Sequence, residues 1–229
     1  MGKDTTWLHW KDPATVGGLM MIVVLIAAAT AWFAGSGVKL VFEFDDGTTQ
    51  AWTADGIFDD TGTKHDGSLY KVAHAETYQS PGGLLSSDPP KDKKGSLCVS
   101  IAQLDSDTNF PSDGSYWRLD VVSPVLSKHW QKSNEFEAYV GDICGVDPGH
   151  VRAIILLNVE KDGAITSLTP TSGAAEQVVS KSDWTKLSAK FTIPSGAYIQ
   201  NIVVRFKGDW NTYELYEGTL YVDHVAATN

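Results

Sequence analysis

Cysteine is scarce in this sequence, and histidine is scattered. The 229 residues include only Cys98 and Cys144, and no C-x-x-C pair occurs, so neither a zinc site nor a thioredoxin-type centre is supported. No two histidines after residue 37 stand at metal-binding spacing. Outside the cytoplasm the two cysteines could form a disulfide, but sequence alone does not give their separation. Two buried thiols therefore remain an equal alternative.

Catalytic signatures are missing as well. The sequence has no G-x-S-x-G elbow, phosphate-binding loop or dinucleotide fingerprint. Carboxylates are plentiful enough for a glycosidase pair, yet nothing singles out two of them. We therefore expect a protein that is not an enzyme.

Basic runs are also lacking. The formal net charge is −10, and before residue 16 Lys3 and Lys11 balance Asp4 and Asp12, so the acidity belongs to the rest of the chain. No basic patch interrupts it along the sequence. Because an acidic surface repels phosphates, we expect no nucleic-acid partner.

One long apolar run stands out against this background. Residues 16–34 contain neither charge nor histidine, and a helix of 19 residues is about 28 Å long, close to the hydrocarbon thickness of a bilayer. Asp12-Pro13 can start that helix, and Gly35-Ser36-Gly37 can end it. The run is bracketed by aromatic side chains that favour the membrane interface: Trp7, Trp10, Trp32 and Phe33. This pattern predicts one transmembrane helix in contact with the lipid bilayer.

A secretory signal peptide is the alternative interpretation of this run, since Ala29-Thr30-Ala31 would suit cleavage. We expect an uncleaved anchor instead. The small excess of lysine before the run predicts a cytoplasmic N-terminus. The predicted organisation is a cytoplasmic head at 1–15, a transmembrane helix at 16–34, a linker at 35–37 and a domain at 38–229. We expect a bacterial inner-membrane protein whose C-terminal domain is periplasmic.

The remainder of the chain reads as strands separated by turns. Asp, Gly, Pro and Ser clusters divide nine strand-like runs, which indicates an all-β antiparallel sandwich. The runs lie at 38–44, 68–76, 96–104, 115–122, 135–143, 151–159, 185–193, 198–206 and 218–226. The runs at 151–159 and 198–206 are the most uniformly apolar, so we expect them in the middle of the sheets.

Several of these segments resemble carbohydrate-binding-module jelly rolls of the galactose-binding-like kind. The opening FEFDDGTTQAWTAD and the ending YEGTLYVDHVAAT carry the resemblance, which extends over most of 38–229 and is shared with the complex I intermediate-associated protein family. It implies a jelly-roll β-sandwich. It also implies a structural Ca²⁺ joining the first strand to the last, held by Glu43 and Asp223 with carbonyls near Asp66 and Ser68.

Aromatic side chains in polar contexts are the candidates for a binding surface. Trp52 and Trp184 fit core positions, so we expect them buried. Four others are predicted to be loop-borne: Trp130, Trp210, Tyr213 and Tyr216. A sugar ring packs its C–H face on such platforms, and Trp and Tyr also dominate protein interfaces, so a glycan and a protein partner both remain open.

The head segment, TTWLHWKDPATVGGL, is similar to the N-terminal heads of light-harvesting α-polypeptides of phototrophs. Those polypeptides carry a histidine inside the span to ligate pigment; this span has none, so no pigment ligand is identified there. We expect an accessory subunit whose helix packs beside other membrane subunits and whose sandwich stabilises their complex. A photosynthetic reaction-centre and light-harvesting assembly is the specific expectation, and a membrane-tethered carbohydrate-binding module is the alternative.

Overall fold

The computed structural model describes most of the chain after residue 39. The described residues are 40–59, 61–64, 69–75, 79–80, 83–84, 95–105, 116–126, 133–146, 151–173, 176–181, 183–209 and 215–227. The chain divides into two units, Met1–Lys39 and Leu40–Asn229, and only the second contains described residues. The predicted span and its aromatic flanks therefore lie outside them. Within the described residues, no helix has the length and apolar character needed to cross a membrane.

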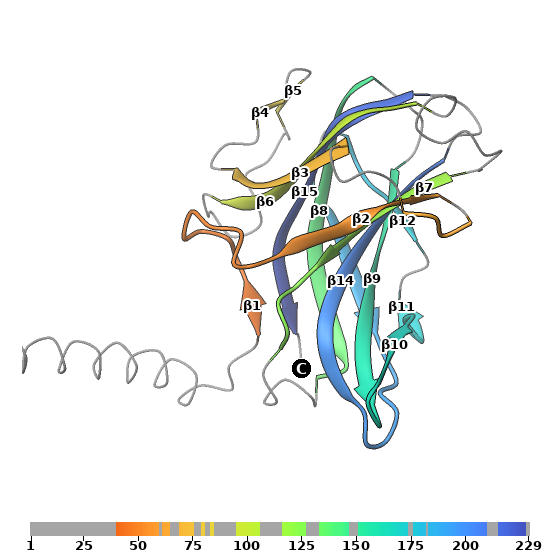
Figure 1. Ribbon diagram of the computed structural model, residues 1–229. Coiled ribbons are helices and arrows are strands. Elements are labelled where there is room, and N and C mark those ends of the chain that lie inside the picture. Colours follow the sequence, from red (N-terminus) through yellow and green to blue (C-terminus); the bar gives the residue numbers. More distant parts are fainter. Residues whose placement is uncertain are drawn as a thin grey trace, which may run out of the picture. The chain divides into compact units, whose positions relative to one another are not determined.

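Two antiparallel sheets pack face to face as a β-sandwich (Figure 1). Sheet A has the order β11-β13-β8-β15-β6-β3, with β1 also paired to β15. Its strands are β1 (Val41–Phe42), β3 (Tyr70–Ala75), β6 (Ser96–Asp105), β8 (Glu135–Val146), β11 (Ser172–Gly173), β13 (Thr185–Lys190) and β15 (Leu215–Ala227). The first and last strands of the domain thus lie side by side in sheet A.

Sheet B has the order β10-β9-β14-β7-β2, with β12 also paired to β9. Its strands are β2 (Thr53–Asp59), β7 (Tyr116–Val122), β9 (Val151–Lys161), β10 (Ala164–Leu168), β12 (Gln177–Val178) and β14 (Tyr198–Asp209). A separate pair is formed by β4 (Gln79–Ser80) and β5 (Gly83–Leu84). The all-β class and the antiparallel sandwich predicted from the sequence are confirmed.

The core lies between the inner faces of the two sheets. Alternate side chains of each strand enter it, as the burial of Trp117, Leu119 and Val121 on β7 illustrates. Trp52 is 2% exposed and packs edge to face against Phe44, so its predicted burial is confirmed. Trp184 is half-buried rather than fully buried.

Two strands of sheet B, β2 and β10, were not predicted from the sequence pattern. β2 contains Asp55 and Gly56, which resemble turn residues, and Gly56 sits at a register shift with φ of 141°. β10 is polar and exposed, and it follows a two-residue turn at Asp162-Gly163 in which both residues have positive φ. The predicted central position of 198–206 is confirmed, because β14 is the middle strand of the path, whereas β9 is one strand from the edge.

Candidate functional site: the outer faces of the two sheets

The outer face of sheet B gathers cationic side chains from three neighbouring strands. In the register of the sheet, Lys207 of β14 is paired with Arg118 of β7 on one side and with Arg152 of β9 on the other. Their inward neighbours are buried while these three side chains are partly exposed, so all three lie on the outer face. We call Arg118, Lys207 and Arg152 the cationic row.

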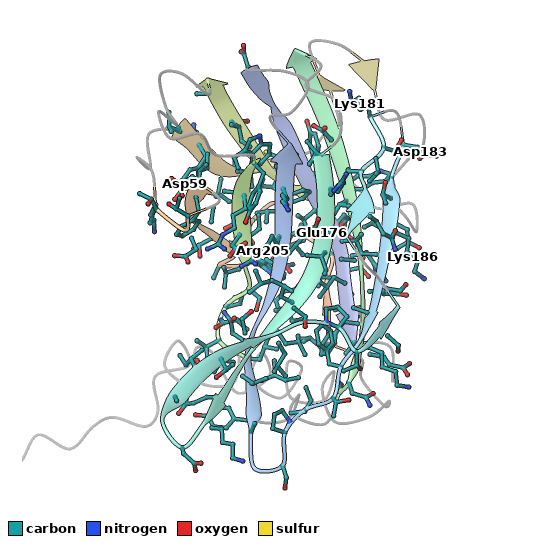
Figure 2. All side chains as sticks on the ribbon, turned by 90° about the vertical axis from the view of Figure 1, so that its right-hand side faces the viewer. Asp59, Glu176, Lys181, Asp183, Lys186 and Arg205 are labelled. Carbon is teal, nitrogen blue, oxygen red and sulfur yellow. The ribbon has the colours of Figure 1, made fainter. Side chains whose placement is uncertain are left out.

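Arg205 lies two residues along β14 from the row and is held by a carboxylate. Its Nε donates to Asp120 Oδ1 at 2.6 Å and its Nη2 donates to Asp120 Oδ2 at 2.7 Å. The hydrogen bonds that Arg205 donates to Asp120 raise the pKa of Arg205 despite its partial burial. Arg118, Arg152 and Arg205 are all the arginines of the chain. In Figure 2, Arg205 is labelled over these strands, with Glu176 beside it.

Two aromatic rings lie next to the row, and cations cover both. The Arg118 guanidinium carbon lies 4.7 Å from the centre of the Phe58 ring, and Lys64 Nζ lies 5.7 Å from it. Lys207 Nζ lies 3.8 Å from the centre of the Tyr116 ring. These contacts orient the cations on the sheet surface, and they occupy the ring faces that a sugar would stack on.

Among the described residues, one acid reaches the cationic row. Lys207 Nζ lies 4.0 Å from Glu176 Oε2, and the Glu176 side chain is 34% exposed. Within the residues the structure describes, Arg118 and Arg152 make no ion pair, and the buried Nε of Arg118 has no hydrogen-bond partner. The row therefore keeps donors for an external acceptor.

Two apolar side chains of β14 and β9 lie on the same face of sheet B as the row. Val203 and Leu156 are paired across β14 and β9 and are each 3% exposed, although their neighbours Ile202, Val204 and Leu157 fill the core on the other side. β14 is thus covered on both faces at this point. In the register of the sheet, the pair of Arg205 and Ile154 lies between these two buried side chains and the cationic row.

The outer face of sheet A arranges its charges differently. His224 is 2% exposed, and its Nδ1 lies 3.0 Å from Glu43 Oε1 while its Nε2 lies 3.2 Å from Glu137 Oε1. Both ring nitrogens of His224 thus face carboxylate oxygens. Lys186 Nζ continues the chain at 2.7 Å from Glu137 Oε2. We call Glu43, His224, Glu137 and Lys186 the sheet A charge chain.

The charge chain shifts the pKa values of its members. Burial alone would raise the pKa of Glu137, but the hydrogen bond and charge of Lys186, together with those of His224, lower it. The hydrogen bond to Glu137 raises the pKa of Lys186. His224 has φ of 44° at a register shift between β15 and β8, so a bulge turns it toward these partners. Strands β1, β15, β8 and β13 are thereby joined.

The calcium ligands implied by the family resemblance are only partly described. Glu43 and Asp223 come from the neighbouring first and last strands, and Asp223 Oδ1 accepts a hydrogen bond from the His224 backbone N–H at 2.8 Å. Asp66 and Ser68 lie outside the described residues. Among the side chains that are described, no group of three or more His, Cys, Asp or Glu could hold a metal ion. The calcium site stays a prediction.

The cysteine alternatives can be compared in the same sheet. Cys98 of β6 is paired with Tyr221 of β15, and Cys144 of β8 is paired with Gly218 on the opposite edge of β15. Two strand spacings put their Cα atoms roughly 10 Å apart or more, beyond the reach of a disulfide. Cys98 is a buried free thiol whose pKa burial raises. Of the two alternatives that the sequence left open, this register is compatible with separate thiols and not with a disulfide between Cys98 and Cys144.

Most of the predicted aromatic platform lies beyond what is described. Trp130, Trp210 and Tyr213 are outside the described residues. Tyr216 lies on strand β15, paired with Leu104 of β6, so its predicted place in a loop was wrong. The cationic row was not predicted from the sequence. Its presence on sheet B contradicts the expectation that the acidic domain has no basic patch. Its signal was the placement of Arg118, Arg152 and Arg205 inside three strand patterns, each between apolar neighbours.

A shallow depression of about 290 Å³ lies on sheet A, away from the row. It is open to solvent and is lined by β8, β11 and β13 residues that include Glu135, Glu137, Ser172 and Lys190. Its charged side chains are already engaged, since Lys190 pairs with Glu135 and Lys186 pairs with Glu137. Nothing in it combines a nucleophile with a base.

Solved structures resemble this chain only distantly. The CBM22-1 xylan-binding domain of Xyn10C from Paenibacillus barcinonensis matches at 15% identity and a TM-score of 0.42, over 82% of this chain and 90% of that one. The C-terminal family 22 carbohydrate-binding module of Clostridium thermocellum Xyn10B matches at 14% identity and a TM-score of 0.46, over 80% and 88%. CBM27-1 of Caldicellulosiruptor saccharolyticus, solved with mannohexaose, matches at 15% and 0.45, over 83% and 96%.

No protein-family model matches the chain, and no curated protein matches it. TM-scores below 0.5 at these identities carry no argument about function, and a β-sandwich hosts many unrelated activities. The function therefore has to be argued from the side chains of the two outer faces.

Proposed function

We propose that this chain is a non-enzymatic, membrane-tethered accessory subunit, whose β-sandwich binds a partner protein of the same membrane through the outer face of sheet B. The observation that carries the proposal is the position of the arginines, because all three lie on this one face, on three adjacent strands. Arginine is enriched at the centres of protein interfaces, where lysine is depleted.

The character of the face supports a macromolecular partner over a small ligand. Its charged, aromatic and apolar side chains are spread over β2, β7, β14 and β9, so the contact area is wide. Small ligands usually bind in concave sites that surround them, whereas partner proteins use broad surfaces with a dry centre and a polar rim. The cationic row and the partly exposed rings of Phe58 and Tyr116 supply the accessible part of this face.

The finer part of the proposal concerns the assembly. The resemblance of residues 5–19 to light-harvesting heads, together with the apolar run at 16–34, makes a photosynthetic reaction-centre and antenna complex the first one to examine. The apolar helix would pack beside the helices of that complex. The sandwich would then reach a subunit exposed on the periplasmic side.

A carbohydrate is the second candidate ligand. Phe58 and Tyr116 lie on the same face as Asn158 and Asn201, so rings and amides that suit a sugar share one surface. Xylan and mannohexaose appear in the names of the solved modules above. Sugar stacking on Phe58 or Tyr116 requires that Arg118 or Lys207 first leaves the ring, which costs the cation–π contact.

Purification in mild detergent from the source membrane separates these candidates. An accessory subunit elutes at a fixed ratio with other membrane proteins, identified by mass spectrometry, and a photosynthetic assembly adds a pigment absorption spectrum. Elution of the chain alone and without colour would contradict the proposal. In that case, binding of the purified full chain to xylan and mannan, measured by calorimetry, would favour the second candidate.

A further inference from the structure

We infer that the cationic row is a docking site for a carboxylate-rich surface of the partner protein, which competes with Glu176 for Lys207. This inference rests on the proposed function and adds the chemistry of the partner. The row consists of Arg118, Lys207 and Arg152, in register across β7, β14 and β9.

The spacing of the row suits two or three carboxylates side by side. Neighbouring strands lie about 4.8 Å apart, so the row extends over roughly 10 Å from Arg118 to Arg152. Acidic side chains one turn apart on a helix, or two residues apart on a strand, lie about 5–7 Å apart and can reach adjacent members of the row. An acidic segment laid across the three strands would thus meet a cation at each step.

The residue types point to carboxylate recognition. Arginine presents a planar fork that binds a carboxylate through two parallel hydrogen bonds, which lysine cannot do. The same face already contains such a pair, because Arg205 binds Asp120 in this two-bond geometry. Arg118 and Arg152 offer the same fork without an acid of their own among the described residues.

Glu176 gives the site a built-in competitor. It approaches Lys207 at 4.0 Å, which is the outer limit of an ion pair, and both side chains are partly exposed. An incoming carboxylate can displace Glu176 at little cost, because water screens an exposed ion pair. Removing the Glu176 charge should therefore strengthen docking rather than weaken it.

Overall charge favours an acidic protein segment over a polyanion such as nucleic acid. The chain has a net charge of −10, so a long run of phosphates is repelled as a whole. A protein segment that carries a few carboxylates among neutral residues meets the row and experiences less of that repulsion. Its association should weaken as salt is added.

The test uses the full chain in its native membrane complex. In mild detergent, the double variant Arg118→Glu/Arg152→Glu should retain at least about tenfold less partner than the unmodified chain, because two attractions become repulsions. The matched control is Lys71→Glu/Lys161→Glu, which changes the net charge equally on exposed sites away from the row, and its retention should change less than about twofold. Thermal melting of each variant shows that it is folded.

Two further variants and a competitor sharpen the result. Glu176→Gln should keep the partner bound at higher salt than the unmodified chain. A short peptide that carries two or three glutamates among neutral residues should release the partner, and neutral xylan or mannan should not. Equal retention by the two double variants, or release by a neutral glycan, would overturn the inference while leaving the subunit proposal intact. If the unmodified chain retains no partner at all, the proposed function fails and the inference fails with it.

Discussion

The two outer faces of the sandwich use charge in opposite ways. On sheet A, acids and bases contact one another in a chain that runs from Glu43 through His224 and Glu137 to Lys186. On sheet B, among the residues that the structure describes, Asp120 pairs with Arg205 and the cationic row has Glu176 at its edge. Charges paired internally stabilise a fold, whereas charges without internal partners are available for binding.

The difference follows from where each face lies in the chain. Sheet A contains the first and last strands, which must be fastened to the sheet, and the charge chain joins β1 and β15 to β8 and β13. Sheet B is fastened by its core: Ile155, Leu157, Val204 and Phe206 are fully buried on its inner face. Its outer side chains are therefore less constrained by folding. Variants that damage one face and spare the other can test this contrast.

The largest expected effect comes from Gly208→Ala in sheet B. A Cβ at Gly208 would fall within the indole of Trp117, which is 1% exposed, so β14 must move away from β7. Overpacking of this kind costs about 1–3 kcal/mol, measurable by urea unfolding. Because Lys207 and Arg118 separate with the strands, partner retention should fall too. Ser188→Ala, an exposed change on β13, serves as the control and should leave both unchanged.

The sequence could predict the sandwich but not the face that binds. Strict alternation in SYWRLDVV places Trp117 inside and Arg118 outside, so the orientation of each arginine was predictable. Their meeting was not, because Arg118, Arg152 and Lys207 are far apart in the chain and only the strand register aligns them. A search for basic runs along the sequence therefore found none.

The sheet A charge chain shows the same limitation. The family resemblance drew attention to Glu43 and Asp223 on neighbouring strands, but it assigned no role to His224. The bulge that turns this histidine toward Glu43 and Glu137 depends on the left-handed backbone conformation of His224 itself. The alternating pattern DHVA does not predict that conformation. A pattern of alternating residues predicts regular strands, but it does not predict where a strand contains a bulge.

A smaller effect is expected from Glu137→Gln in the sheet A charge chain. The folded protein holds the pKa of Glu137 below its ordinary value of 4.5, so its stabilisation is present above that value and is lost as pH falls through the lower folded pKa. At pH 7 the variant should lose about 1 kcal/mol of unfolding free energy. As pH falls below 4.5, the difference between the two proteins should shrink in urea titrations. A constant difference across pH would contradict the electrostatic explanation. Partner retention should not change.

Tyr221→Phe tests how a residue of sheet A affects stability at alkaline pH. Burial, with a contribution from the charge of Cys98, raises the pKa of Tyr221 to about 12 from 10.0. Stability linked to this group is therefore intact below pH 10 and declines as pH rises toward 12, because the unfolded chain ionises first. The variant keeps the ring contact with Trp184, so its stability should decline less between pH 10 and 12. Urea unfolding at pH 9 and pH 11 measures the difference, and parallel losses in both proteins would exclude Tyr221 as the cause.

The smallest effect is expected from Lys190→Ala. Comparison with Lys186→Ala shows whether an ion pair linked to further charges stabilises the fold more than an isolated exposed pair. Lys190 and its partner Glu135 are 52% and 40% exposed, so water screens the pair and its loss should change the unfolding free energy by roughly 0–0.5 kcal/mol. Lys186→Ala removes a cation from Glu137, which is 19% exposed and also contacts His224. That variant should lose more than Lys190→Ala and should have a higher acid midpoint. Equal effects of the two lysines would mean that sheet A gains nothing from linking its charges, and the contrast with sheet B would then rest on the arginines alone.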